Sequence, residues 1–395
     1  MAYILYFMVI TFLLTFLTKR SHGLIVASII TFLFIALSYP AGGDWIGYFA
    51  NYDCVVNNVC APGFMLFEPG YELIVSIFGF LGFQAIIIAI AFINILLVCK
   101  FARSFENSVF IIFAIMCMFL WSIYIEAIRQ AIAISLVMFG ITYLNKGKAK
   151  QYALLVLFAS CFHITALICL IALLPLYWRR GSKIVAYALL FFGMSFFFFA
   201  NQILRTVLSI LPGQSIASEK LEFYLSSAEY QPQLSIGSGT VLDVLLIILL
   251  ILSFSRIKKQ KLALNNSIND IVFLGVCLYI SFGIFIGKMM PVMTRIGWYG
   301  FPFVLIALYS NVGGSIFYRG YNLTRRITLM QAAIFGYFIL QIIRPFTYDY
   351  SNYNILTQES VLQNLDALDD TSLRVAAKEK CLVLTNMGYG FLCSL

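Results

Sequence analysis

The stretch SYPAGGDWIGYFANYDCVVNNVCAPGFMLFEPGYE, residues 38–72, is the longest polar interruption in the first half of a chain otherwise built of apolar runs. Within it, Asp44, Tyr48 and Tyr52 recur at every fourth position. This spacing predicts a short helix with a carboxylate and two phenols on one face. Acids and aromatic hydroxyls gathered in this way suggest the handling of sugars or phosphates. The alternative is a loop of ordinary helix caps and interfacial tyrosines.

The end of the same stretch predicts the start of a second helix. Glu68 and Glu72 repeat the spacing of four, and Pro69 suits the first helical turn because its missing N–H would have no partner there. Two further carboxylates are therefore expected on one face of this helix, next to the first group.

Composition places the chain in a membrane. Hydrophobic residues make up 62% of it and charged residues 11%, and the mean hydropathy is +0.94, well outside the range of soluble domains. The apolar runs reach about 15 to 25 residues and lack the alternation of a β-barrel. We therefore expect an all-α polytopic membrane protein. Residues 2–18 are interpreted as a first span rather than a cleaved signal peptide.

About twelve membrane segments are expected, with both termini outside and a cavity open to the outer side. Lysines and arginines flank the apolar stretch 151–178 at both ends, so we interpret it as two half-helices that meet near His163 and return to the same side. The other spans are expected at about residues 2–18, 24–39, 72–98, 108–124, 126–144, 184–200, 241–255, 268–287, 292–310 and 327–343.

These spans define a membrane domain over residues 1–343, with outer loops at 40–71 and 201–240, and a polar outer tail at 344–395. An alternative exists for segment 72–98, where FGFLGF at residues 78–83 could divide one span into two. A division into two full spans would invert every later segment, and the lysines and arginines would then no longer concentrate on the cytoplasmic side. We therefore expect one tilted or kinked span.

The net charge of +9 does not indicate a nucleic-acid partner, because the basic residues sort by side of the membrane. Most of the 26 lysines and arginines fall in loops expected to be cytoplasmic, whereas of the 17 acids only Glu106 and Asp270 do. The basic residues expected outside are Arg129, Arg205, Lys220, Lys288, Arg295, Arg344, Arg374, Lys378 and Lys380.

The nine cysteines show no CxxC spacing, so no metal or redox motif is indicated. Cys54 and Cys60 lie in an outer loop, where a disulfide could form, and the alternative is two packed thiols. The cysteines within the apolar runs are expected to be small fillers. GxSxG, HExxH, P-loop and Rossmann patterns are also missing from the sequence, so neither a metal nor a cofactor is expected.

Three arginines stand at the predicted outer ends of spans. Arg129 lies one turn inside its helix, Arg295 lies one turn below the surface after a proline, and Arg344 ends the last span. An arginine costs about 2.5–3.5 kcal/mol at the centre of a membrane helix. Guanidinium groups suit the oxygens of a diphosphate. The alternatives are a structural ion pair between Glu126 and Arg129, and snorkelling to lipid phosphates for the other two.

Six motifs in order and spacing resemble the EpsG-type bacterial polysaccharide polymerases, which include many O-antigen polymerases of the Wzy class. The motifs are GGDWIGYFANY, FEPGYELIVSIFG, IRQAIAISL, FHITAL, TRIGWYGF and PFTYDY. The resemblance runs from about residue 38 to residue 350. It implies an inner-membrane enzyme that acts at the periplasmic face on oligosaccharide units linked to undecaprenyl pyrophosphate, which would be both donor and acceptor. Membrane lipid and a chain-length regulator are further partners that fit such an enzyme.

The resemblance also implies which residues form the site. Those that match the family's motifs are Asp44, Tyr48, Glu68, Tyr71, Glu72, Arg129, Gln130, His163, Arg295 and Asp349.

Roles follow from charge. Arg129 and Arg295, supported by Arg344, would hold the donor diphosphate. Asp44 or Glu72 would take the proton of the acceptor hydroxyl.

His163 would orient or relay that proton, although a lone histidine can also be purely structural. The aromatic faces expected to stack on sugars are Trp45, Tyr48, Trp298 and Tyr299.

Three other functions compete with a polymerase. A lipid-linked oligosaccharide flippase should carry charge to both membrane faces, and an acyltransferase needs a histidine that reaches an acyl donor. An O-antigen ligase shares the donor and differs only in its acceptor, so it is the hardest of the three to separate from a polymerase.

Overall fold

Helices form the regular structure of the described part of the chain, as the composition predicts. The computed structural model describes residues 20–38, 44–58, 60, 67–211, 221–222, 225–226, 232–234, 237–259, 266–312, 329–343 and 369–386. No strand occurs among these residues. The expectation of an all-α fold is therefore confirmed.

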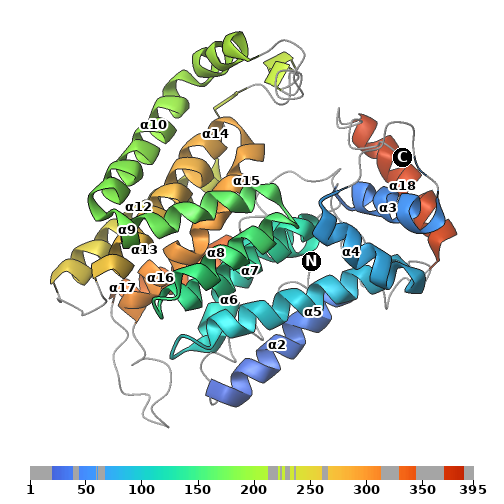
Figure 1. Ribbon diagram of the computed structural model, residues 1–395, viewed down its shortest axis with the longest axis horizontal. Helices are drawn as coiled ribbons and strands as arrows, with labels where there is room; N and C mark the ends of the chain where they lie inside the picture. Colours follow the sequence, from blue (N-terminus) through green and yellow to red (C-terminus); the bar gives the residue numbers. More distant parts are fainter. Residues whose placement is uncertain are drawn as a thin grey trace. The chain divides into compact units, whose positions relative to one another are not determined.

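The chain divides into two compact units. The first comprises Met1–Leu167, Gly314–Ile327 and Phe338–Leu395, and the second comprises Ile168–Gly313 and Thr328–Tyr337. The described helices of the first unit are α2 (Arg20–Ala36), α3 (Asp44–Asn57), α4 (Pro69–Phe78), η1 (Gly79–Leu81), α5 (Phe83–Ala102), α6 (Ser108–Phe119), η2 (Leu120–Glu126), α7 (Ile128–Leu144), α8 (Ala149–Ser160) and α18 (Asp370–Asn386) (Figure 1).

The second unit continues the helical pattern. Its described helices are most of η3 (Ile164–Leu173), then α9 (Leu174–Tyr177), α10 (Arg179–Ile210), α12 (Ser238–Lys259), α13 (Asn266–Leu278), η4 (Tyr279–Ile286), α14 (Gly287–Met289), η5 (Pro291–Met293), α15 (Thr294–Gly297), η6 (Trp298–Gly300) and α16 (Phe301–Val312). Helix α17 (Leu329–Ile343) contributes residues to both units.

The described residues include five helical stretches that are long and apolar enough to cross a membrane. These are Phe83–Ala102, Ser108–Glu126, Arg179–Ile210, Ile268–Met289 and Pro291–Ser310. Several apolar helices of 10–17 residues accompany them. The chain is thus a membrane protein, whereas the number of twelve segments stays a prediction. The expected span over residues 2–18 lies outside the described residues.

The expected bounds of a span over residues 72–98 are wrong, because a break divides this stretch into two helices. Helix α4 ends at Phe78, the single turn η1 follows, and α5 begins at Phe83. Between them Gly82 has a φ of 97°, a left-handed conformation that glycine adopts without the steric cost other residues meet. The stretch long enough to cross is α5 alone.

The residues before that break form a short helix with an apolar exposed side. Helix α4 and η1 have 10 and 3 residues, so together they measure about 20 Å, less than the roughly 30 Å of a hydrocarbon core. Leu73, Ile77 and Phe80 are 59%, 50% and 76% exposed, while Tyr71 on the other side is fully buried. This pattern is typical of a helix that lies along a membrane surface. A helix that does not cross leaves the sidedness of the later spans unchanged.

The stretch 151–178 contains the expected break. Helix α8 ends at Ser160, and η3 begins at Ile164 after a turn over residues 161–163. Two helical segments that meet near His163 are therefore confirmed. Their return to one side of the membrane stays a prediction.

Two further features concern the second unit. Helix α10 is kinked at the non-helical Phe199 and continues to Ile210, into residues expected to lie in the outer loop 201–240. Helix α15 packs against η4 with their backbones close together, since a Cβ added at Gly297 would lie 2.2 Å from the Gly283 nitrogen. Small residues allow membrane helices to approach in this way.

Candidate functional site

Arg129 stands at the centre of a polar and aromatic cluster in the first unit. It is the second residue of α7 and follows the π-helical segment η2. Such segments often occur at functional sites. The Arg129 guanidinium is ion-paired with Glu68, and its carbon lies 3.7 Å from the centre of the Phe67 ring. It also donates a hydrogen bond to the Tyr48 hydroxyl. The arginine is thus held by a carboxylate, a phenol and an aromatic face.

Glu68 reaches Arg129 because of its place on α4. It is the N-cap residue, Pro69 occupies the first turn as predicted, and the Glu68 side chain makes no capping hydrogen bond. Its carboxylate is therefore available to the arginine instead of to the helix end. Among the described residues, the ion pair of Arg129 is with Glu68 and not with Glu126, the partner considered from the sequence.

Three aromatic rings surround the guanidinium. The ring centres of Tyr48, Phe67 and Tyr71 lie 5.5–5.7 Å from one another. Tyr48 is 4% exposed and Tyr71 is fully buried. The Tyr71 hydroxyl and the Arg129 Nε are buried with no hydrogen-bond partner in the described structure. Buried polar atoms are rarely left unpaired, so this cluster has hydrogen-bonding capacity for a further group.

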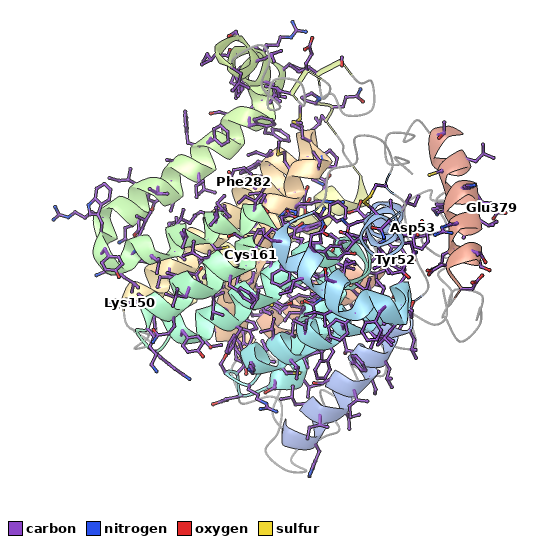
Figure 2. The ribbon with its side chains drawn as sticks, turned by 45° about the vertical axis from the view of Figure 1, so that its right-hand side comes forward. Tyr52, Asp53, Lys150, Cys161, Phe282 and Glu379 are labelled. Carbon is purple, nitrogen blue, oxygen red and sulfur yellow. A yellow bond between two sulfur atoms is a disulfide. The ribbon has the colours of Figure 1, made fainter. Side chains whose placement is uncertain are left out.

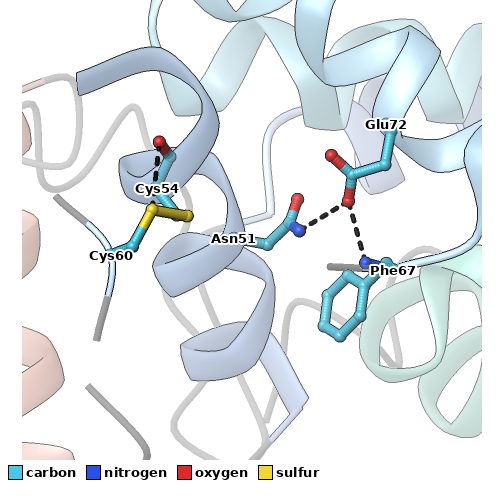
Figure 3. Close-up of a disulfide and its surroundings, with 5 residues drawn as sticks. All are labelled: Asn51, Cys54, Cys60, Phe67 and Glu72. Atoms are coloured by element: carbon cyan, nitrogen blue, oxygen red, sulfur yellow. Dashed lines mark hydrogen bonds between the residues drawn. A yellow bond between two sulfur atoms is a disulfide. The ribbon is translucent and has the colours of Figure 1, made fainter. Parts of the chain in front are cut away.

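Glu72 fastens the cluster to the preceding helix. Its Oε1 accepts hydrogen bonds from the Asn51 side chain at 2.6 Å and from the Phe67 backbone N–H at 2.9 Å (Figure 3). Cys54 and Cys60, on the other side of Asn51 in this view, form a disulfide. This settles the alternative that the sequence left open. The loop is therefore held by a covalent bond at one end and by Glu72 at the other.

Asp44 begins α3 and is partly exposed, one helical turn before Tyr48. The predicted helix with this spacing is confirmed. A carboxylate in the first turn is also favoured by the helix dipole, so the position has a structural reason beside any catalytic one.

His163 lies in a turn that contacts the start of α4. The Gly70 N–H donates to the Cys161 carbonyl at 2.7 Å, and a Cβ at Gly70 would lie 2.8 Å from that oxygen. His163 itself is partly buried, with Nδ1 2.6 Å from the Thr165 hydroxyl. The turn that contains His163 therefore contacts α4 at Gly70, two positions after Glu68.

The remaining predicted residues lie elsewhere along the chain. Gln130 is 1% exposed within α7. Arg295 and Trp298 are partly exposed and Tyr299 is fully buried, all in the second unit. Trp45 is 6% exposed, so of the four aromatic residues expected to stack on sugars only Trp298 is more than slightly open. Arg344 and Asp349 lie outside the described residues.

Two side chains and one helix were not expected from the sequence to contribute. The side chains, Phe67 and Asn51, carry no charge, so nothing in the local pattern distinguishes them. The helix is α18, whose Arg374 donates two hydrogen bonds to Asp53 on α3, at 2.9 and 2.6 Å. The tail was expected only as a polar extension.

A sequence model of the EpsG family matches residues 22–355. The match covers every described residue of the Arg129 cluster and stops before α18. No curated protein and no solved structure matches the chain.

Proposed function

Because the chain belongs to the EpsG family, we propose that it is a polysaccharide polymerase that joins oligosaccharide units carried on undecaprenyl pyrophosphate, at the periplasmic face of the bacterial inner membrane. The observation that carries the proposal is the Arg129 cluster. A charged residue at the end of an apolar helix is costly to bury and is normally retained for a function. Here the arginine has an exchangeable partner, Glu68, and unpaired polar atoms beside it.

A diphosphate would replace Glu68 on Arg129. Guanidinium groups bind carboxylates and phosphates through the same pair of parallel N–H donors, so Glu68 occupies the position that a donor phosphate would take. The Tyr48 and Tyr71 hydroxyls could then donate to the remaining phosphate oxygens. In the resting protein, Glu68 keeps the buried guanidinium paired.

The transfer itself forms one bond and breaks one. The acceptor hydroxyl oxygen bonds to the anomeric carbon of the donor sugar, the bond from that carbon to the diphosphate oxygen breaks, and the lipid diphosphate leaves with its electron pair. Arg129 stabilises the charge that develops on the leaving group. Asp44 or Glu72 takes the proton of the acceptor hydroxyl, and Glu72 is held in place by the two hydrogen bonds that its Oε1 accepts. His163 stays proposed as the residue that orients or relays the proton.

Ion pairs within each unit support the proposed sidedness. Among the described residues, each ion pair joins residues expected on the same side. The outer pairs are Arg129–Glu68, Arg374–Asp53 and Lys288–Asp243, and on the inner side Asp270 pairs with both Arg179 and Lys183.

The test uses the purified full-length protein with a synthetic repeat unit linked to undecaprenyl pyrophosphate. We expect a ladder of products that differ by one repeat unit. Arg129→Ala should abolish the ladder, and so should Asp44→Ala, while Arg205→Ala removes an exposed arginine as the control and should retain it. A ladder that persists in Arg129→Ala would remove that residue from the site. A single transfer onto a different lipid would identify a ligase instead.

A further inference from the structure

Helix α18 packs on α3 through a set of polar contacts that lies beyond the region matched by the family. Figure 1 shows the two helices side by side, and Figure 2 shows Tyr52 and Asp53 on the side of α3 that meets α18. Arg374 binds Asp53 with two parallel hydrogen bonds, and the Tyr52 hydroxyl donates to Asp370 at 2.8 Å. Paired guanidinium–carboxylate bonds of this kind fix orientation as well as distance.

The same helix α3 carries part of the Arg129 cluster. Tyr48 lies one turn before Tyr52 and accepts from Arg129, and Asn51 holds Glu72. Both residues are buried. Helix α3 therefore connects α18 to the cluster as a rigid element of four turns, with α18 bound to its second half.

An electrostatic interaction also relates α18 to the end of η2. Lys380, two turns after Arg374, is partly buried, and burial lowers its pKa while the nearby Glu126 carboxylate acts to raise it. Glu126 is the last residue of η2 and precedes Arg129 by three positions. Helix α18 thus binds α3 through printed polar contacts, and its Lys380 lies within electrostatic range of Glu126 at the end of η2.

We infer that α18 is a clamp for the candidate site, with Arg374 and Asp370 as positioning residues that hold α3 so that Tyr48 and Asn51 keep Arg129 and Glu72 in place. The clamp adds an element that the family-matched region does not contain. Its effect on catalysis rests on the proposed function. Its effect on α3 does not.

The first experiment measures amide hydrogen exchange of α3 in the purified full-length protein in lipid nanodiscs. Arg374→Ala should speed exchange in the peptides of α3 by about tenfold or more, the scale of a lost charged hydrogen bond. Lys378→Ala, which removes an exposed charge from the same helix, should leave it within about twofold. The exchanged pair Asp53→Arg with Arg374→Asp should restore much of the protection, which a general loss of folding would not allow.

The second experiment measures polymer formation in the same variants. Arg374→Ala should lower the turnover number several-fold. The exchanged pair should recover it, and Lys378→Ala should leave it unchanged. If the unaltered protein makes no polymer but Arg374→Ala still speeds exchange in α3, the clamp is supported and the proposed function is rejected. An active protein whose Arg374→Ala variant matches Lys378→Ala in both exchange and turnover would overturn the clamp and leave the proposed function standing.

Discussion

At the scale of single residues, the position of Glu68 decides what Arg129 can do. A largely buried arginine with no counter-charge would be destabilising, so the carboxylate is needed in the resting protein. The same carboxylate competes with any anion that approaches the guanidinium. Both partners are partly exposed, at 21% and 24% of their side-chain surface, so the pair can open without unfolding the helix ends.

This competition predicts the effect of Glu68→Gln. The neutral amide leaves Arg129 without its charge partner, so inorganic pyrophosphate should bind about tenfold more tightly than to the unaltered protein. Isothermal titration calorimetry of the purified protein measures this directly. Glu379→Gln, an exposed change on α18, serves as control and should not alter binding. Weaker binding in Glu68→Gln would mean that Glu68 supports the anion site instead of occupying it.

The Asp53–Arg374 pair predicts a pH dependence. Burial alone would raise the Asp53 pKa, but the hydrogen bonds from Arg374 and Asn57 and the charge of Arg374 lower it below its usual range. A carboxyl group whose pKa is lower in the folded state stabilises the fold above its unfolded pKa of about 3.9, and this contribution disappears as the pH falls through the folded value.

The unfolding temperature of the unaltered protein should therefore exceed that of Asp53→Asn by a constant difference from pH 7 to about pH 5, and the difference should shrink below about pH 4. Thermal unfolding followed by tryptophan fluorescence at each pH measures it. A difference that grows with acid would contradict the pairing.

At the scale of elements, α4 depends on one close backbone contact. Its first turn has unpaired N–H groups, and that of Gly70 is satisfied by the Cys161 carbonyl of the turn that contains His163. A side chain at this position would meet both the carbonyl and the Phe162 ring. The approach of α4 to the His163 turn thus requires a glycine.

Gly70→Ala should lower stability by about 1–3 kcal/mol, the usual effect of forcing extra atoms into a packed site. The unfolding temperature in detergent measures the loss. Gly336→Ala on α17 is the matched control, since nothing lies within 4 Å of an added Cβ there, and alanine is the better helix former. Equal unfolding temperatures for the two variants would show that α4 can move away from the His163 turn at no cost.

At the scale of the whole molecule, the sidedness of the membrane segments remains the main prediction. It depends on α4 and η1 not crossing, which their combined length of about 20 Å supports, so that α5 runs from the outer to the inner side. The ion pairs agree with this arrangement in both units.

A labelling experiment tests the sidedness. Thr371→Cys and Ser104→Cys place a thiol on two exposed positions that are expected outside and inside, respectively. A membrane-impermeant maleimide should label Thr371→Cys in intact cells and Ser104→Cys only after the membrane is permeabilised. The unaltered chain gives the background from its own free thiols. The reverse pattern would invert the topology and place the Arg129 cluster on the cytoplasmic side.

The sequence by itself determined the features that depend on composition and local spacing. The hydropathy required a helical membrane protein. Asp44, Pro69 and the turn at His163 marked helix boundaries because capping, proline geometry and broken apolar runs act within a few residues. The glycines of FGFLGF indicated a possible break near Gly82. Glycine spacing alone does not distinguish a kink within one helix from a turn with positive φ between two helices.

Only the tertiary structure decided which charges pair. Arg129 binds Glu68 across 61 residues and not Glu126 across three, and Arg374 reaches Asp53 across 321 residues. Nothing in a local pattern specifies such partners, because they depend on where the loops return after the apolar helices have packed. The candidate site is therefore built from residue types that the sequence displays and from contacts that only the folded chain brings together.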